Sequence, residues 1–252
     1  MHFTSEPRSR DGVVERDFVL GETPGILWTP ETVGTPVPLI LLAHPGGLGQ
    51  MYPRLALRAR QAVASGFAAA TIELPGSGDR QQLPSSQRAR DDLRRALDAD
   101  EPIDGELIDR LVLPLVELAV PEWQELLDEV LGLPEVGGPV AYSGGNISIG
   151  VRLAAVEPRI VAAGLFAGSF VPRSIVEQAR RVTIPLHVLL QWDDEGNDRQ
   201  VALDLFDAFG SREKSLSANM GGHRGVPQHA GEEVSKFFAR HLSPDTSGAV
   251  RL

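Results

Sequence analysis

Short apolar runs alternate along the chain with longer stretches in which apolar residues recur every three or four positions. Residues Val37–Ala43 are apolar throughout, which is typical of a strand that is covered on both faces. Strands that alternate with amphipathic helices predict βαβ units around a mostly parallel sheet. The expected strands are Val13–Leu20, Ile26–Trp28, Val37–Ala43, Ala68–Leu74, Pro139–Tyr142, Ile160–Phe166, Ile184–Leu190 and Lys214–Ala218.

Helical spacing of apolar residues predicts the segments between these strands. In Pro53–Ser65, Leu55, Ala59 and Ala62 share one face, and Gly66 follows the end. The other expected helices are Pro121–Leu131, Ile147–Val156, Ser174–Arg181, Arg199–Phe209 and Glu232–Leu242. A length of 252 residues suits one large α/β domain, and we expect residues 1–252 to form one.

One connection is longer than a βαβ unit requires. Residues 75–137 number 63, about twice what one helix with short loops needs. Helix Pro121–Leu131 can serve as the crossover, which leaves residues 81–120 as a helical insertion. Two interpretations stay open, structural padding and a lid over the strand ends. A lid would place its apolar residues over the substrate, namely Leu111, Val112, Leu115, Val116 and Leu118.

Composition and charge exclude several classes of function. The chain has no cysteine, so it has no disulfide framework and no thiolate nucleophile. Its formal charge is −10, and the arginines of residues 88–95 are interleaved with Asp91 and Asp92, which favours a solvated helix over a nucleic-acid surface. No apolar leader or stretch long enough for a membrane span is evident. We expect a cytoplasmic protein without nucleic-acid or membrane partners, and its preference for arginine over lysine favours a bacterial source.

Candidate chemistry begins at Ser143. The segment Ala141–Gly145 (AYSGG) follows a predicted strand and precedes a predicted helix, which is the context of a G-x-S-x-G nucleophile elbow. Alanine replaces the first glycine of that motif. The pattern predicts a serine nucleophile, and a Ser-Gly-Gly turn without chemistry is the alternative.

A second glycine motif, His44-Pro45-Gly46-Gly47, directly follows strand Val37–Ala43. Backbone N–H groups of Gly46 or Gly47, together with that of Gly144, can form an oxyanion hole. Pro45 has no N–H to donate. We expect His44 to shape this loop rather than to act as a base.

The remaining parts of a triad follow two later strands. Asp194 is the favoured acid and Asp193 its alternative, since both follow strand Ile184–Leu190. His223 lies in a glycine-flanked loop before the last helix and is the favoured base, with His229 as the alternative. The order Ser143, Asp194, His223 is one of the known chain orders of the triad.

With these motifs the sequence resembles the α/β-hydrolase superfamily, in particular small bacterial serine esterases similar to the dienelactone hydrolase-like group. The resemblance extends from about Val13 to Leu242 and includes the turn LPGSGDR at Leu74–Arg80. It implies an eight-stranded, mostly parallel sheet flanked by helices, with a small helical insertion before the nucleophile strand. Acyl-enzyme chemistry without a metal or organic cofactor is implied as well. Dienelactone hydrolases use a cysteine nucleophile, so their activity is not carried over to this chain.

The expected function is therefore hydrolysis of a small carboxylic ester, or of a related acyl bond, by Ser143, Asp194 and His223. A thioesterase, lactonase or amidase would use the same residues, so the fold does not decide among them. A non-hydrolytic binding protein and a cofactor-free lyase or perhydrolase stay open as alternatives on the same fold.

Overall fold

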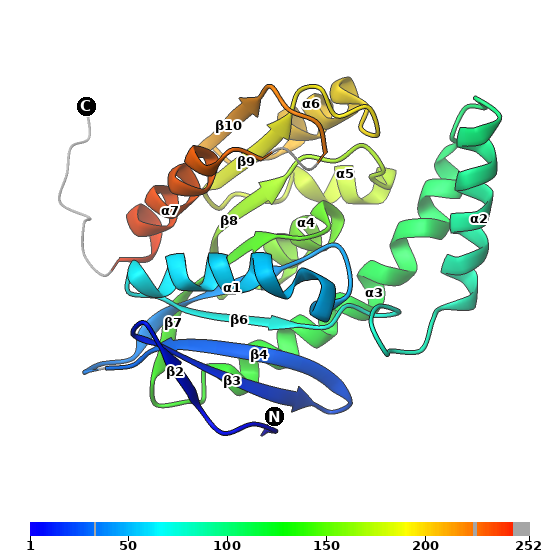
Figure 1. Ribbon diagram of the computed structural model, residues 1–252. Helices are drawn as coiled ribbons and strands as arrows, with labels where there is room; N and C mark the ends of the chain where they lie inside the picture. The colour runs from blue at the N-terminus through cyan, green and yellow to red at the C-terminus, as the bar shows by residue number, and fades with distance from the viewer. Residues whose placement is uncertain (33, 224–225, 244–252) are drawn as a thin grey trace, which may run out of the picture.

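The computed structural model describes residues 1–32, 34–223 and 226–243 (Figure 1). Its strands are β1 His2–Phe3, β2 Arg8–Arg10, β3 Val13–Leu20, β4 Thr23–Pro30, β5 Val37–Ala43, β6 Ala68–Ile72, β7 Val136–Gly144, β8 Ile160–Phe166, β9 Leu186–Gln191 and β10 Lys214–Asn219. Its helices are α1 Leu48–Ala64, α2 Pro84–Asp98, α3 Gly105–Val130, α4 Ile147–Val156, α5 Arg173–Ala179, α6 Arg199–Ala208 and α7 Gln228–Leu242.

All the strands form one twisted sheet in the order β1-β3-β4-β6-β5-β7-β8-β9-β10, and β2 pairs with β3. Strands β5 to β10 pair in parallel, whereas β4 runs antiparallel to β3 and β6. The eight expected strands are all present. The short strands β1 and β2 extend the antiparallel edge beyond the expected eight, because they contain few apolar residues for a pattern to detect.

Helices cover both faces of the sheet (Figure 1). Helices α1 and α7 pack on one face with a core that includes Leu55, Ala59 and Phe238. Helices α3 to α6 pack on the other face around a larger core that includes Trp123. Side chains of a strand alternate between the two faces, so each central strand contributes to both cores.

Helix α1 begins at Leu48, five residues before the proline that was expected to start it. The reason is a long-range cap: both carboxylate oxygens of Glu73 accept the backbone N–H of Leu48, at 3.0 and 2.9 Å. A carboxylate at a helix N-terminus satisfies an orphan N–H and interacts favourably with the helix dipole. Pro53 therefore lies inside the helix.

The insertion is helical, as expected, but it is continuous with the crossover. Helix α3 runs without a break from Gly105 to Val130 and includes both Pro114 and Pro121. The Asp104 carboxylate caps its start by accepting the Leu107 N–H at 2.7 Å. Burial of one apolar face along most of its length outweighs the hydrogen bonds that the prolines remove.

Helix α2 and the first half of α3 form an antiparallel hairpin that projects away from the rest of the molecule (Figure 1). Val112 and Val116 were expected to cover the substrate, and this expectation is wrong. They are 3% and 0% exposed and belong to the core between the sheet and helices α3 to α6. Leu118 is 44% exposed. The hairpin is therefore anchored by part of the face that was expected to contact substrate.

Of the helices in the described ranges, none is both long enough and apolar enough to cross a membrane.

Candidate active site

Ser143 lies at the carboxyl end of the central strand β7, where it pairs with Leu42 of β5 and Gly164 of β8. The residue is 6% exposed. The sharp turn into α4 is made by Gly144 and Gly145, whose φ angles are +84° and +70°. Among the described residues other than glycine, only Asp11 and Asp100 have a positive φ. Ser143 lies within β7, so its backbone is extended.

The Ser143 side chain points toward the face covered by α1. Residues two apart in a strand share a face, and Ala141 belongs to the core under α1. Val140 and Tyr142 belong to the core on the other face. Arg58 of α1 meets Ser143 there, because its Nη2 donates to Ser143 Oγ at 2.9 Å and to the Ser143 carbonyl at 2.7 Å. Among the described residues, this is the hydrogen bond that reaches the hydroxyl.

Asp194 and His223 are already paired. His223 Nδ1 lies 2.8 Å from Asp194 Oδ2, and the Asp194 side chain is 8% exposed while that of His223 is 81% exposed. An Nδ1–H that donates to Asp194 leaves the lone pair on Nε2, the tautomer that a general base requires. The pair comes from two strand ends, since Asp194 follows β9 and His223 follows β10.

The alternatives to these two residues lie differently. Asp193 uses its backbone N–H to bond the Gly221 carbonyl at 3.3 Å, which holds the two loops together. His229 is exposed in the first turn of α7. A surface groove of about 490 Å³ is lined by Asp193, Asp194, Glu195, Gly196, Gly222 and His223.

His223 and Ser143 are not joined by a hydrogen bond among the described residues. Their strands are three places apart in the sheet order β7-β8-β9-β10, which separates the strand ends by about 14 Å at a spacing of about 4.8 Å. A direct bond therefore requires the loop after β10 to reach back over β8 and β9. The structure brings Asp194 and His223 together and leaves Ser143 apart from them.

The loop after β5 carries the expected oxyanion glycines next to the end of β7, since Ala43 pairs with Gly144. His44 is 1% exposed, and its ring nitrogens face the carbonyls of Gly46 at 2.5 Å and Ile72 at 3.0 Å. Burial lowers the pKa of His44, which favours the neutral ring. His44 thus contacts backbone on both sides.

Glu73 ties this loop to the turn after β6. Besides the Leu48 N–H, its Oε1 accepts the Leu74 N–H at 3.2 Å. A Cβ on Gly78 would lie 2.4 Å from Glu73 Oε2, so only glycine leaves room for the carboxylate there. Neither Glu73 nor Arg58 was predicted from the sequence. The available signal for Arg58 was its position three residues after Leu55, on the buried face of α1.

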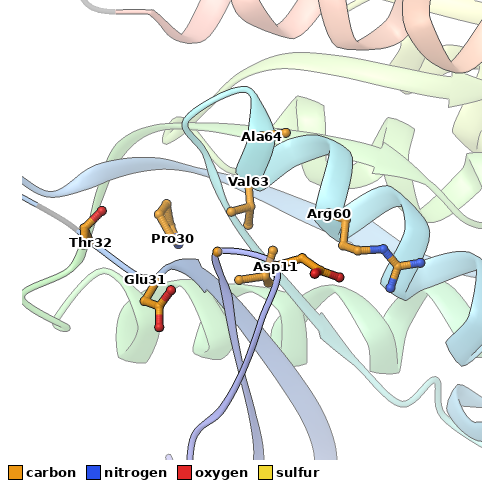
Figure 2. Close-up of a pocket in the computed structure, with 9 residues that line it drawn as sticks. Asp11, Pro30, Glu31, Thr32, Arg60, Val63 and Ala64 are labelled. Atoms are coloured by element: carbon orange, nitrogen blue, oxygen red, sulfur yellow. The ribbon is translucent and has the colours of Figure 1, made fainter.

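Among the described residues, no second candidate site is evident. The described residues contain no group of three or more histidine, aspartate or glutamate side chains arranged to hold a metal ion. A groove of about 460 Å³ between the ends of β4 and α1 is lined by residues that include Asp11, Glu31 and Arg60 (Figure 2). The carboxyl end of β4 lies beside the amino ends of the parallel strands, because β4 runs antiparallel to β6. The groove is therefore at the opposite end of the strands from Ser143.

Strand order, crossovers and the position of these loops define the α/β-hydrolase fold, as the sequence predicted. The structure is similar to a cold-adapted esterase from an Arctic intertidal metagenomic library (TM-score 0.75, 24% identity, 96% of this chain and 100% of the other). It is also similar to acetyl xylan esterase 1 from Thermoanaerobacterium sp. JW/SL YS485 (0.64, 14%, 95% and 87%). A third similar structure is a dienelactone hydrolase from Anabaena variabilis ATCC 29413 (0.62, 17%, 95% and 100%).

No protein-family model matches the sequence, and no curated protein matches it. At these identities the similarity establishes the fold. The roles of Ser143, Asp194 and His223 stay predictions.

Proposed function

We propose that the protein hydrolyses a carboxylic ester or related acyl bond of a small molecule, with Ser143 as nucleophile, His223 as base and Asp194 as the acid that orients it. The observation that carries this proposal is the preformed Asp194–His223 pair, with its 2.8 Å hydrogen bond, at the same sheet edge as Ser143. The esterase and dienelactone hydrolase names of structures with this fold support the reaction class.

In the proposed mechanism, the lone pair on His223 Nε2 accepts the Ser143 proton while Ser143 Oγ attacks the carbonyl carbon. The buried Asp194 stabilises the imidazolium that forms. The leaving alcohol takes the proton, and water then attacks the acyl-enzyme with His223 again as base. His223 is exposed, and the loop that carries it after β10 has to reach back over β8 and β9 to bring its ring to Ser143.

The N–H groups of Gly46 or Gly47 and of Gly144 are the proposed donors to the oxyanion. Support comes from the register, because Ala43 and Gly144 are direct partners and the two donor segments therefore begin side by side. Loss of one such donor typically costs about 2.7–4 kcal/mol of transition-state stabilisation. The hairpin within residues 81–120 is the proposed lid, since it projects from the part of the molecule that follows β6.

Hydrolysis of p-nitrophenyl esters from acetate to octanoate tests the proposal. We expect turnover by the wild type, and a fall of about 10⁴-fold or more in Ser143→Ala. Asp194→Asn should lose about 10⁴-fold by favouring the wrong tautomer, whereas the matched control Asp193→Asn should retain activity. Activity that persists in Ser143→Ala, or that is lost in Asp193→Asn and kept in Asp194→Asn, would refute the assignment.

The turn geometry favours a second candidate, a non-hydrolytic binding protein. The left-handed residues are Gly144 and Gly145, and the Ser143 hydroxyl is buried against Arg58 instead of standing on the strained residue of the turn. A fluorophosphonate probe separates the two candidates. Labelling at Ser143, located by peptide mass spectrometry, supports the hydrolase, whereas a folded wild type that does not react supports the binding protein.

A further inference from the structure

Arg58 is an unusual residue for its position in α1. The residues of the same face, Leu55, Ala59 and Ala62, are buried apolar side chains that pack on the sheet. Among the described residues, no carboxylate lies within ion-pair distance of the Arg58 guanidinium. A charged group placed among apolar neighbours without a counter-ion is costly, so its contacts are expected to have a use.

The contacts of the guanidinium all lead to the candidate site. Nη1 donates to the carbonyl of Ala43 at 3.0 Å, and Nη2 donates to the carbonyl and the hydroxyl of Ser143. Arg58 thus joins the end of the strand that precedes the oxyanion loop to the end of the strand that carries the nucleophile. A Cβ on Gly144 would lie 2.9 Å from Nη2, so this glycine leaves room for the guanidinium.

Arg58 remains a cation at neutral pH. Burial lowers its pKa to about 10, which still leaves nearly every molecule protonated at pH 7. A cation this close to a hydroxyl favours the ionised oxygen, by roughly 10- to 1,000-fold for an opposite charge within hydrogen-bond reach. The hydroxyl accepts from Arg58 through an oxygen lone pair, so its own proton remains free for a base.

We propose that Arg58 is a catalytic residue that stabilises the Ser143 alkoxide as it forms. This inference rests on the proposed function. In the attack, the loop after β10 has brought His223 to Ser143, the Oγ–H bond breaks, and its proton passes to His223 Nε2. The Oγ electron pair forms the bond to the carbonyl carbon, and the carbonyl π electrons move to the oxyanion. Arg58 keeps its proton throughout and holds Oγ by the 2.9 Å hydrogen bond until the new bond forms.

The test measures the rate of Ser143 labelling by a fluorophosphonate as a function of pH, beside ester turnover. Arg58→Gln should lower the rate at pH 7 by roughly 10- to 1,000-fold and move the rise of the rate to higher pH. Arg58→Lys, which keeps a cation, should recover part of the loss. Arg60→Gln is the matched control, because this exposed arginine lies on the same helix beside the groove at the opposite edge.

A loss of folding would mimic a loss of catalysis, so two further readouts separate them. Each variant is first checked for cooperative thermal unfolding. Arg58→Ala is then labelled with and without methylguanidinium, which should restore part of the rate by occupying the vacated space, an effect that a purely structural role does not predict.

The outcomes are distinct. A wild type that neither labels nor hydrolyses esters overturns the proposed function and this inference with it. An active wild type with Arg58→Gln unchanged overturns the role of Arg58 alone. A folded Arg58→Gln that labels faster than the wild type also overturns it, since the arginine would then restrain Ser143 instead of activating it.

Discussion

Gly144 is the residue on which the geometry of the candidate site depends most. Its φ of +84° is unfavourable for any residue with a side chain, and an added Cβ would also lie 3.1 Å from the Ala43 carbonyl. We expect Gly144→Ala to lower the free energy of unfolding by about 1–3 kcal/mol in urea titrations. Gly49→Ala is the matched control, because a Cβ there meets open space. Equal stability of Gly144→Ala and wild type would contradict the geometry.

His187 is a buried histidine outside the candidate site. Its Nδ1 bonds Ser215 Oγ at 2.8 Å, its Nε2 has no partner among the described residues, and Phe237 packs on its ring at 5.7 Å between centroids. Burial lowers the pKa of His187. The folded protein therefore keeps the ring neutral at a pH where the unfolded chain, with a pKa of about 6.5, binds a proton.

This difference has a defined sign in the stability. The contribution of His187 is complete above about pH 6.5 and is lost as the pH falls, at no more than about 1.4 kcal/mol per pH unit for one proton. We expect His187→Leu to show a smaller decrease in unfolding free energy between neutral and mildly acidic pH than the wild type. Identical pH dependence of the two proteins would show that His187 titrates alike in both states.

At the scale of elements, the hairpin of α2 and α3 tests the lid hypothesis. Arg110 of α3 contacts Asp92 of α2 at 3.0 Å, which joins the two helices across the hairpin. Replacing residues 84–111 by a short Gly/Ser linker should leave a cooperatively folded protein, because α2 is largely exposed. If the hairpin is a lid, KM for the longer esters should rise while acetate turnover changes little.

A core variant provides the contrast for that excision. Trp123 lies in the second half of α3 and is 0% exposed, so Trp123→Ala should cost about 3–5 kcal/mol of stability. If the excision lowers stability as much as Trp123→Ala does, the hairpin is structural padding, which is the other interpretation of the insertion.

Sequence patterns located the elements well where the signal was local. Strand β5 was found with its observed bounds because both of its faces are buried, so every position is apolar. The start of α1 was missed because its cap, Glu73, lies 25 residues away along the chain. The continuity of α3 was missed because Pro114 and Pro121 normally end helices, and only packing against the sheet overrides that preference.

The same distinction applies to the candidate site. The pairing of Asp194 with His223 was predicted because both follow strands whose carboxyl ends meet at one edge. Arg58 was not predicted, since its contact with Ser143 spans 85 residues and depends on the rotation of α1 against the sheet. Periodicity indicates that a helix has a buried face but not which strand ends that face meets.

At the scale of the whole molecule, the two faces of one sheet carry separate cores. Leu55 lies in the core under α1 and α7, and Leu127 in the core under α3 to α6, and both are at most 1% exposed. Every central strand contributes to both cores, so loss of either should destabilise the whole sheet. We therefore expect the chain to unfold as one domain.

The measurement is urea unfolding of Leu55→Ala, Leu127→Ala and the double variant, followed by both near- and far-UV circular dichroism. Each single substitution should cost about 2–5 kcal/mol and shift one transition on which both probes agree. Because the residues lie on opposite faces, the double variant should equal their sum within about 0.5 kcal/mol. Separate transitions, one sensitive to each substitution, would instead show that the two cores unfold independently and that the 252 residues do not form a single cooperative domain.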